Sequence, residues 1–166
     1  MVSQSVRSDV CLFINLLLLF TLARAHHLQT LPGHNSSIDC VKFAYSDDFV
    51  YSADDTGVIK RWNLNASDSI SLFGHMKSVR TLDFYPYSDS YLVSGSNDTS
   101  IRLWDVREKV CIKRYRGHMS HVNSVKFSPD GSWIASAGAE ARNRTYPMLT
   151  PYAALIPELM PKMARD

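Results

Sequence analysis

The sequence has little of what marks several common classes of protein. Its 166 residues contain three cysteines, Cys11, Cys40 and Cys111, which form no paired framework of the kind that stabilises small secreted domains. Cys40 and Cys111 fall within apolar strand patterns, which is typical of reduced, buried thiols in a cytosolic protein. The formal net charge of +2 gives no general attraction to nucleic acid or to a membrane surface. We therefore expect neither as a partner.

Motifs for common catalytic chemistries are also missing. There is no Gly-rich loop ending in Lys-Ser/Thr, so nucleotide hydrolysis is not supported, and no Gly-x-Ser-x-Gly element that would expose a serine nucleophile. The close histidine pairs, His26-His27 and His118-x-x-His121, lack a third ligand at a spacing that suits a metal ion. We expect no catalytic residue, metal site, cofactor or small-molecule substrate.

Long apolar runs are absent, apart from one near the N-terminus. Residues 1–25 combine Arg7, an apolar run at 11–22 and a small-x-small triplet at 23–25, which is typical of a secretion signal. The run is interrupted by Asn15 and is too short to span a bilayer. Two interpretations stay open: a working signal peptide, which would imply secretion, or a leader that is not native to the rest of the chain. The free cysteines further along favour the second.

What the chain does contain is a repeat that begins with a Gly-His pair. The pairs start at residues 33, 74 and 117, in steps of 41 and 43, and Trp62 and Trp104 stand 42 residues apart. Short alternating strands lie between them, separated by turn signals such as Ser128-Pro-Asp-Gly131. This period and the Trp104-Asp105 pair are typical of the four-stranded blade of a WD-repeat β-propeller.

We therefore predict an all-β chain, a partial WD-repeat propeller with two full four-stranded blades, part of a third, and irregular or short-helical ends. The expected propeller fragment covers residues 26–140, with blades at about 32–73, 74–116 and 117–140, and a proline-containing tail at 141–166 lies outside the repeat. Residues 28–31 match the last strand of a preceding blade. The other expected strands are 38–43, 49–53, 58–63, 69–73, 79–84, 91–95, 100–106, 110–115, 122–127 and 133–137.

Recurring polar residues predict a hydrogen-bonded set inside each blade. In the second blade, the carboxylate of Asp98 would accept from the imidazole of His75. Ser94 would contact the other ring nitrogen and the indole N–H of Trp104. The equivalent residues in the other blades are His34, Ser52, Trp62, His118 and Ser136. We expect this set to be structural.

Two blades depart from the pattern. Thr56 stands at the aspartate position of the first blade and Asn63 replaces the Asp of its Trp-Asp pair, so we expect a weaker network there. In the third blade Glu140 stands at the aspartate position, and no Trp-Asp strand follows.

A competing class of function is a secreted hydrolase, because serine, histidine and aspartate occur in one cluster. A nucleophile needs an exposed oxygen beside a base, with oxyanion donors nearby. Ser94 is instead expected on a buried strand next to an indole. The structural interpretation is therefore favoured.

Some stretches are more specific than the general repeat. They are Thr81-Leu-Asp-Phe-Tyr-Pro-Tyr87, Ser94-Gly-Ser-Asn-Asp-Thr99, Leu103-Trp-Asp-Val-Arg107, Tyr115-Arg-Gly-His118 and Phe127-Ser-Pro-Asp-Gly-Ser-Trp133. Together they resemble the non-catalytic WD-repeat subunits of katanin, the microtubule-severing complex, over about residues 27–138. The resemblance implies a propeller that targets and regulates a separate AAA ATPase subunit.

The katanin resemblance also implies partners and a location. The partners are the ATPase subunit and microtubules, and the location is the cytoplasm and the microtubule cytoskeleton, including the spindle pole and centrosome. In that family a C-terminal helical domain binds the ATPase, and nothing in residues 141–166 resembles it.

Two groups of residues are candidates for contacting a partner. Alternate side chains of an outer strand face solvent, so Lys109, Lys113, Arg114 and Arg116 could form a basic strip that suits an acidic surface such as the microtubule. An ordinary charged edge strand is the alternative. Trp104-Asp105-Val106-Arg107 also resembles the Trp-Asp-x-Arg box of cullin-RING ubiquitin-ligase substrate receptors, which implies Arg107 as a contact to the ligase adaptor.

Overall fold

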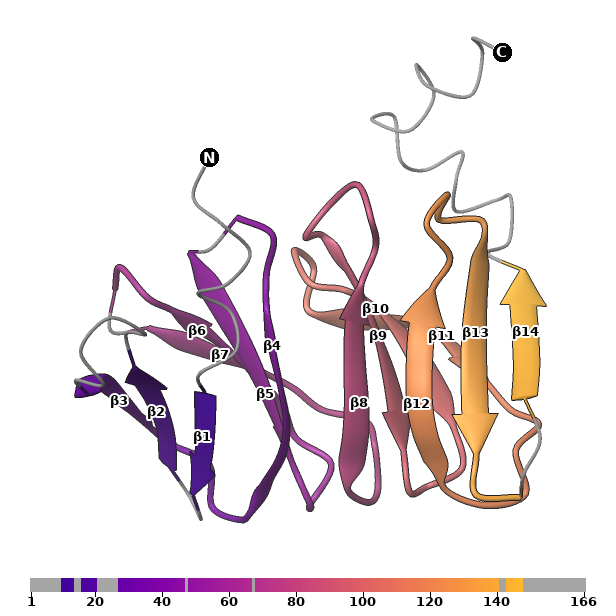
Figure 1. The fold of residues 1–166 in the computed structure, drawn as a ribbon, viewed down its shortest axis with the longest axis horizontal. Coiled ribbons are helices and arrows are strands. Elements are labelled where there is room, and N and C mark those ends of the chain that lie inside the picture. Colours follow the sequence, from indigo (N-terminus) through magenta and orange to yellow (C-terminus); the bar gives the residue numbers. More distant parts are fainter. Residues whose placement is uncertain are drawn as a thin grey trace, which may run out of the picture.

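The structure is a computed structural model that describes residues 10–13, 16–20, 27–46, 48–66, 68–140 and 143–147. Within these ranges every regular element is a β-strand, and the strands form four antiparallel sheets (Figure 1). The described residues include no helix long and apolar enough to cross a membrane.

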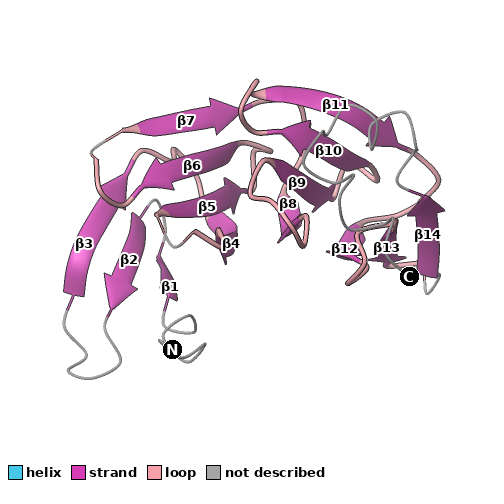
Figure 2. Ribbon diagram, turned by 90° about the horizontal axis from the view of Figure 1, so that it is seen from above, coloured by secondary structure: helices cyan, strands magenta, loops and turns pink. Residues whose placement is uncertain are grey.

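Two four-stranded sheets form the middle of the molecule. The first contains β4 (Ile38–Phe43), β5 (Phe49–Asp54), β6 (Ile59–Asn63) and β7 (Ser69–Leu72). The second contains β8 (Val79–Phe84), β9 (Tyr91–Ser96), β10 (Ile101–Asp105) and β11 (Val110–Tyr115). Figure 2 shows the sheets along an arc, with β4, β8 and β12 on its inner side and β7 and β11 on its outer side. The predicted all-β architecture of partial propeller blades is confirmed.

The third sheet contains a strand that the sequence pattern did not predict. It consists of β12 (Val122–Phe127), β13 (Trp133–Gly138) and β14 (Asn143–Pro147). Ile134 pairs with Tyr146, and Ser136 pairs with Arg144. Tyr146 takes the place that Trp104 has in the second sheet, so the Trp-Asp signature is missing although the strand is present. The boundary expected at residue 140 therefore lies inside this sheet, and residues 148–166 lie outside the described part of the chain.

At the other end, the predicted outer strand at 28–31 is present as β3 (His27–Pro32). The structure pairs it with β2 (Leu16–Phe20), which in turn pairs with β1 (Val10–Phe13). The apolar run of the leader thus supplies two strands of a three-stranded sheet, where irregular or helical structure was expected. The choice between a signal peptide and a leader that is not native stays a prediction.

The core lies between neighbouring sheets. Tyr51, Ile59 and Leu72 of the first sheet pack against Phe84 and Trp104 of the second. The second and third sheets share another cluster, built from Tyr85, Tyr91, Val93, Ile101, Leu103, Tyr115, Val122, Val125, Phe127 and Ile134. Apolar side chains on both faces of each middle sheet therefore leave water on folding, which is the main stabilising contribution.

Burial along equivalent strands shows which face remains open. Every residue of β9 is buried, because a sheet covers it on each side. In β13 buried and exposed residues alternate at the start of the strand, and Trp133 is 48% exposed. The outer face of the third sheet is therefore uncovered in the described part of the chain. An uncovered apolar face of this kind makes marginal stability or aggregation the expected behaviour of the isolated chain.

Gly95 lies where the second and third sheets approach most closely. A Cβ atom there would meet Val122 Cγ1 at 2.7 Å and Thr81 Cγ2 at 2.8 Å, which is too close for either methyl group. We expect Gly95→Ala to lower the free energy of unfolding by about 1–3 kcal/mol, the usual cost of overpacking. Urea denaturation measures it. Ala137→Gly, at the equivalent position of the third sheet, is the control and should cost roughly 0.5–1 kcal/mol; a neutral Gly95→Ala would contradict the close packing.

Candidate functional site

The polar set of the second blade is fully connected. His75 Nδ1 lies 2.9 Å from Asp98 Oδ2, and His75 Nε2 lies 2.7 Å from Ser94 Oγ. Trp104 Nε1 donates to the same Ser94 Oγ at 2.8 Å. A carboxylate only accepts, so Nδ1 carries the ring proton, and the Ser94 hydroxyl donates to Nε2 while accepting from the indole. Every polar group of this network therefore has a hydrogen-bond partner.

Asp98 connects this set to the surrounding loops. Asp98 Oδ1 accepts from the Ser100 backbone N–H at 2.9 Å and from Ser100 Oγ at 2.6 Å. Oδ2, which faces His75, also accepts from the Met76 backbone N–H at 3.1 Å. The carboxylate thus joins the loop before β8 to the turn between β9 and β10. Thr99 in that turn has a φ of 69°, a left-handed conformation that is uncommon for a residue with a branched side chain.

The first blade has an equally complete network, which corrects the prediction of a weaker one. His34 contacts Ser52 Oγ at 2.6 Å and Asp54 Oδ2 at 2.8 Å, and Trp62 Nε1 donates to Ser52 Oγ at 2.7 Å. Asp54 is the carboxylate, and Thr56 at the expected position donates its hydroxyl to it at 2.6 Å. The prediction failed because it required the carboxylate four residues after the serine, whereas a turn allows it two residues after.

The third blade keeps only part of the network. His118 Nε2 contacts Ser136 Oγ at 2.7 Å, and Nδ1 contacts the carboxylate of Glu140. Tyr146 replaces the indole, and its buried hydroxyl has no hydrogen-bond partner among the described residues. Ser136 therefore lacks the indole donor that Ser52 and Ser94 have.

Burial fixes the charge states in this network. Burial lowers the pKa of His75 against the opposing effect of Asp98, and burial likewise lowers the pKa of His34 against the opposing effect of Asp54. Burial alone would raise the pKa of Asp98, but hydrogen bonds from His75 and Ser100 outweigh it and hold that pKa well below its ordinary value. The networks thus consist of neutral imidazoles and ionised carboxylates.

The geometry does not favour the hydrolase interpretation. Ser94 is 0% exposed, and its Oγ is engaged with both His75 and Trp104. A nucleophile has to reach a substrate carbonyl while a base takes its proton. The hydroxyl here lies between an imidazole and an indole, so its observed contacts are those of a structural residue. No group of three or more potential metal ligands occurs among the described residues.

The predicted basic residues lie on and beside β11, the outer strand of the second blade (Figure 2), but they do not form one strip. Arg114 and Arg116 are exposed near its C-terminal end, and Lys109 is exposed before its first residue, at the opposite end. Lys113 is half-buried, with Nζ 5.2 Å from the centre of the Tyr115 ring. Only Arg114 and Arg116 therefore share one exposed region.

Arg107 lies at the same end of the second blade as Lys109. Its guanidinium donates to Asp105 Oδ2 at 3.1 Å and to the Tyr91 hydroxyl at 3.0 Å, and 56% of its side chain is exposed. It also lines a cavity of about 280 Å³ between the first two sheets, together with Tyr51, Arg61 and Asp89. Asp105 and Tyr91 hold the guanidinium in place at the surface.

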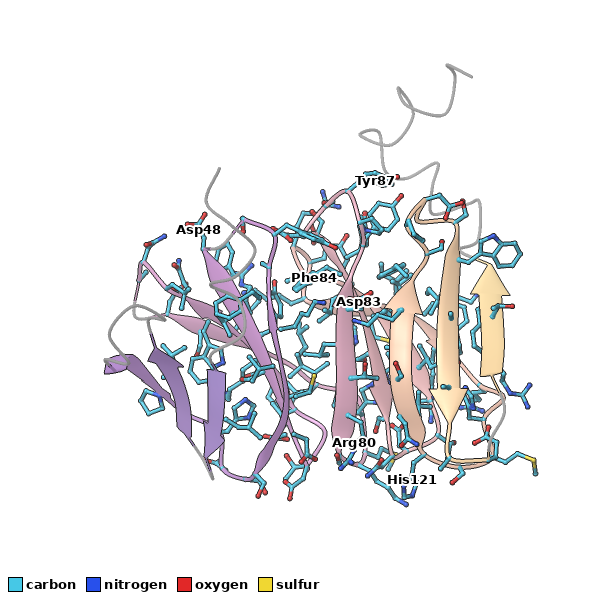
Figure 3. All side chains as sticks on the ribbon, in the orientation of Figure 1. Asp48, Arg80, Asp83, Phe84, Tyr87 and His121 are labelled. Atoms are coloured by element: carbon cyan, nitrogen blue, oxygen red, sulfur yellow. The ribbon has the colours of Figure 1, made fainter. Side chains whose placement is uncertain are left out.

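Lys42, Asp83 and Lys126 form a charged row across the inner strands that was not predicted from the sequence. Asp83 on β8 accepts from Lys42 Nζ of β4 at 3.0 Å and from Lys126 Nζ of β12 at 3.1 Å. It also accepts from the Phe127 backbone N–H at 3.0 Å. Figure 3 shows Asp83 beside β12. The signal was available, because the three positions are spaced 41 and 43 residues apart, the same steps as the Gly-His pairs.

Removing the shared hydroxyl tests the polar networks. Ser94→Ala leaves the buried indole N–H of Trp104 and one nitrogen of His75 without partners, and each unsatisfied buried group costs about 1–3 kcal/mol. We expect the free energy of unfolding to fall by roughly 2–4 kcal/mol, measured by urea denaturation. Ser136→Ala is the control and should cost about half as much, because Ser136 has no indole partner. Equal costs would contradict the role of the indole.

Acid should destabilise the fold through the same groups. The unfolded chain takes up protons at histidine below about pH 6.5, while the buried imidazoles of His34 and His75 remain neutral, so the unfolded state binds more protons. Stability therefore declines as the pH falls from 7.5 towards 5 and declines further as Asp54 and Asp98 approach their unfolded pKa. The urea midpoint at several pH values measures this. A midpoint that rises on acidification would contradict the neutral imidazoles.

Comparison with known proteins agrees with this architecture. The family described as "WD domain, G-beta repeat" matches residues 25–63, 67–105 and 109–144. Each match begins one strand before a sheet, so a sequence repeat joins the outer strand of one blade to three strands of the next. The third match includes the first residues of β14, which extends the repeat beyond residue 140.

Several curated proteins are similar to the chain. A guanine nucleotide-binding protein subunit beta from Zea mays is 31% identical over 132 residues, which cover 74% of this chain and 34% of that protein. Coatomer subunit beta'-1 from Arabidopsis thaliana is 33% identical over 105 residues, 61% of this chain and 11% of that protein. Eukaryotic translation initiation factor 3 subunit I from Emericella nidulans is 36% identical over 105 residues, 63% of this chain and 31% of that protein.

The chain thus spans about a third or less of the length of these relatives, none of which is a katanin subunit. What the repeats and the relatives have in common is a WD-repeat scaffold for protein–protein interaction. On the match of three repeats to three successive sheets, the chain belongs to the WD40 repeat family.

Proposed function

We propose that the chain is a non-enzymatic targeting module that resembles the WD-repeat subunit of katanin and binds the acidic surface of microtubules through its second blade. The observation that carries the proposal is the exposed pair Arg114 and Arg116 at one end of β11. Neither guanidinium has a carboxylate partner among the described residues. Unpaired positive charge on an outer strand attracts an acidic partner and is screened by salt.

The position of these arginines on the outer strand supports a targeting role. Two lysines of the inner strands are already engaged, since Lys42 and Lys126 both contact Asp83. Strand β11, which contains Arg114 and ends just before Arg116, lies on the convex side of the arc, and a large, flat partner such as a microtubule can approach this side. In this proposal the partners are microtubules and the katanin ATPase subunit, and the chain works in the cytoplasm on the microtubule cytoskeleton.

A second candidate function follows from Arg107. Its side chain is held at the surface by Asp105 and Tyr91, as a fixed contact residue would be. With the Trp-Asp-x-Arg box, this geometry supports a substrate receptor that binds a cullin-RING ligase adaptor. Pull-down of the adaptor by the chain, lost in Arg107→Ala, distinguishes this function from microtubule targeting.

Charge reversal tests the microtubule proposal. We expect Arg114→Glu combined with Arg116→Glu to reduce co-sedimentation with microtubules at least roughly tenfold at low salt, because attraction at this end of β11 becomes repulsion. High salt should weaken binding of the original chain as well, since exposed charges are screened.

Lys77→Glu combined with Arg80→Glu is the matched control, because it changes the net charge equally on exposed residues elsewhere. This control should retain most of the binding. Equal loss in both double variants would show that only the net charge matters. Unchanged binding in the Arg114/Arg116 variant would rule out this end of β11 as the microtubule contact.

A further inference from the structure

Two arginines lie directly opposite each other in the second blade. Arg102 of β10 and Arg114 of β11 are register partners in the antiparallel pair. Side chains of opposite residues project from the same face of a sheet, about 5 Å apart at Cβ, and like charges at such positions destabilise it. Both arginines also contribute to lowering the pKa of His75, after the larger effect of burial, so their charges lie close to the same polar network.

The first blade shows one way in which a cation at this place is balanced. Lys60 is equivalent to Arg102, since each lies two residues before the tryptophan. The register partner of Lys60 is Ser71, whose hydroxyl accepts from Lys60 Nζ at 2.8 Å. In the second blade the corresponding partner is a second cation. The acceptor that the first blade supplies internally is therefore missing from the second.

The guanidinium of Arg102 is poorly satisfied. Its Nε is buried and has no hydrogen-bond partner among the described residues. Its Nη1 contacts Cys111 Sγ at 3.6 Å, and sulfur is a weak acceptor. No carboxylate of the described residues lies within ion-pair distance of Arg102 or Arg114. A buried donor without a partner is costly, and the exposed guanidinium of Arg114 beside it can take up a carboxylate from outside the chain.

An apolar contact is available next to this pair. Arg102 Nη1 would lie 2.7 Å from a Cβ atom built on Gly74, so the guanidinium packs directly against the backbone at this glycine. Phe73, the preceding residue, is 71% exposed. An exposed aromatic residue next in the chain to the glycine that the Arg102 guanidinium contacts suits a ligand that carries both a negative charge and an apolar side chain.

We propose that Arg102 and Arg114 form a binding site for a carboxylate of an acidic peptide segment, with Phe73 contacting an apolar residue of the same segment. A carboxylate accepts several hydrogen bonds and can bridge two guanidinium groups. The site deepens the proposed function, on which it rests, by naming the residues that meet an acidic partner. It adds Arg102 and Phe73 to the basic residues identified from the sequence.

Binding of a defined peptide to the full chain tests the site. The probe is a fluorescein-labelled peptide of glutamates around a central phenylalanine, followed by fluorescence anisotropy. We expect Arg114→Ser, which copies the serine of the first blade, to weaken binding about tenfold, the loss of one charge-assisted interaction. Arg80→Ser removes the same charge from another exposed residue and should change binding by roughly twofold or less.

A second measurement separates binding from folding. Without peptide at low salt, Arg114→Ser should raise the melting temperature, because the repulsion with Arg102 is removed. The peptide should raise the melting temperature of the original chain but not that of Arg114→Ser. A peptide with glutamine in place of glutamate should bind neither. An Arg114→Ser variant that melts lower and binds the peptide as before would overturn the proposal.

Two further outcomes identify the ligand. Inorganic phosphate that protects the original chain as well as the peptide does, at equal ionic strength, would overturn the assignment to a peptide. Microtubule co-sedimentation of Arg114→Ser is measured in parallel. If Arg114→Ser still binds the peptide but no longer co-sediments, this site is overturned and the proposed function stands. If it loses peptide binding but still co-sediments, the site is supported and its part in microtubule targeting is contradicted.

Discussion

The described fold depends on a buried hydroxyl that joins an imidazole to an indole. In the first two blades, Ser52 and Ser94 each accept from a tryptophan and donate to a histidine. An unpaired polar group inside a sheet stack would cost more than the hydrogen bond contributes, so such a network has to be complete. It fixes the loop, the turn and the third strand of a blade relative to one another, and the apolar faces can then meet in a single register.

Contacts between blades supply what the networks within blades cannot. Asp83 accepts from lysines of both neighbouring inner strands, and Gly95 allows β12 to approach β8 and β9. The middle blade is consequently buried on both faces, whereas Trp133 of the third sheet remains exposed. Since a blade buries its apolar faces only against other blades, the stability of such a chain is a property of the stack.

The charged outer strand has a different character from the rest of the molecule. On the inner strands Asp83 pairs with Lys42 and Lys126, and the histidines of the first two networks are neutral. Arg102 and Arg114 face each other without a carboxylate among the described residues, where the first blade has Lys60 and Ser71. An unbalanced pair of cations contributes nothing favourable to folding, and this is why an outside acceptor, rather than fold stability, accounts for it best.

The repeat period by itself determined the blade architecture, the positions of the strands from β3 to β13 and the four-residue network of His75, Ser94, Asp98 and Trp104, because the networks need fixed residue types at nearly fixed spacing. Local sequence could not determine that the carboxylate beside His34 comes from Asp54 and not from position 56, since a turn can present either position to the same imidazole. It also could not reveal β14, whose Tyr146 lacks the Trp-Asp signature, nor the pairing of the leader strands with β3. The ion pairs of Asp83 with Lys42 and Lys126 join residues that are remote in the chain. Arg102 and Arg114 face each other across two paired strands. Both arrangements therefore form only when the strands are in register.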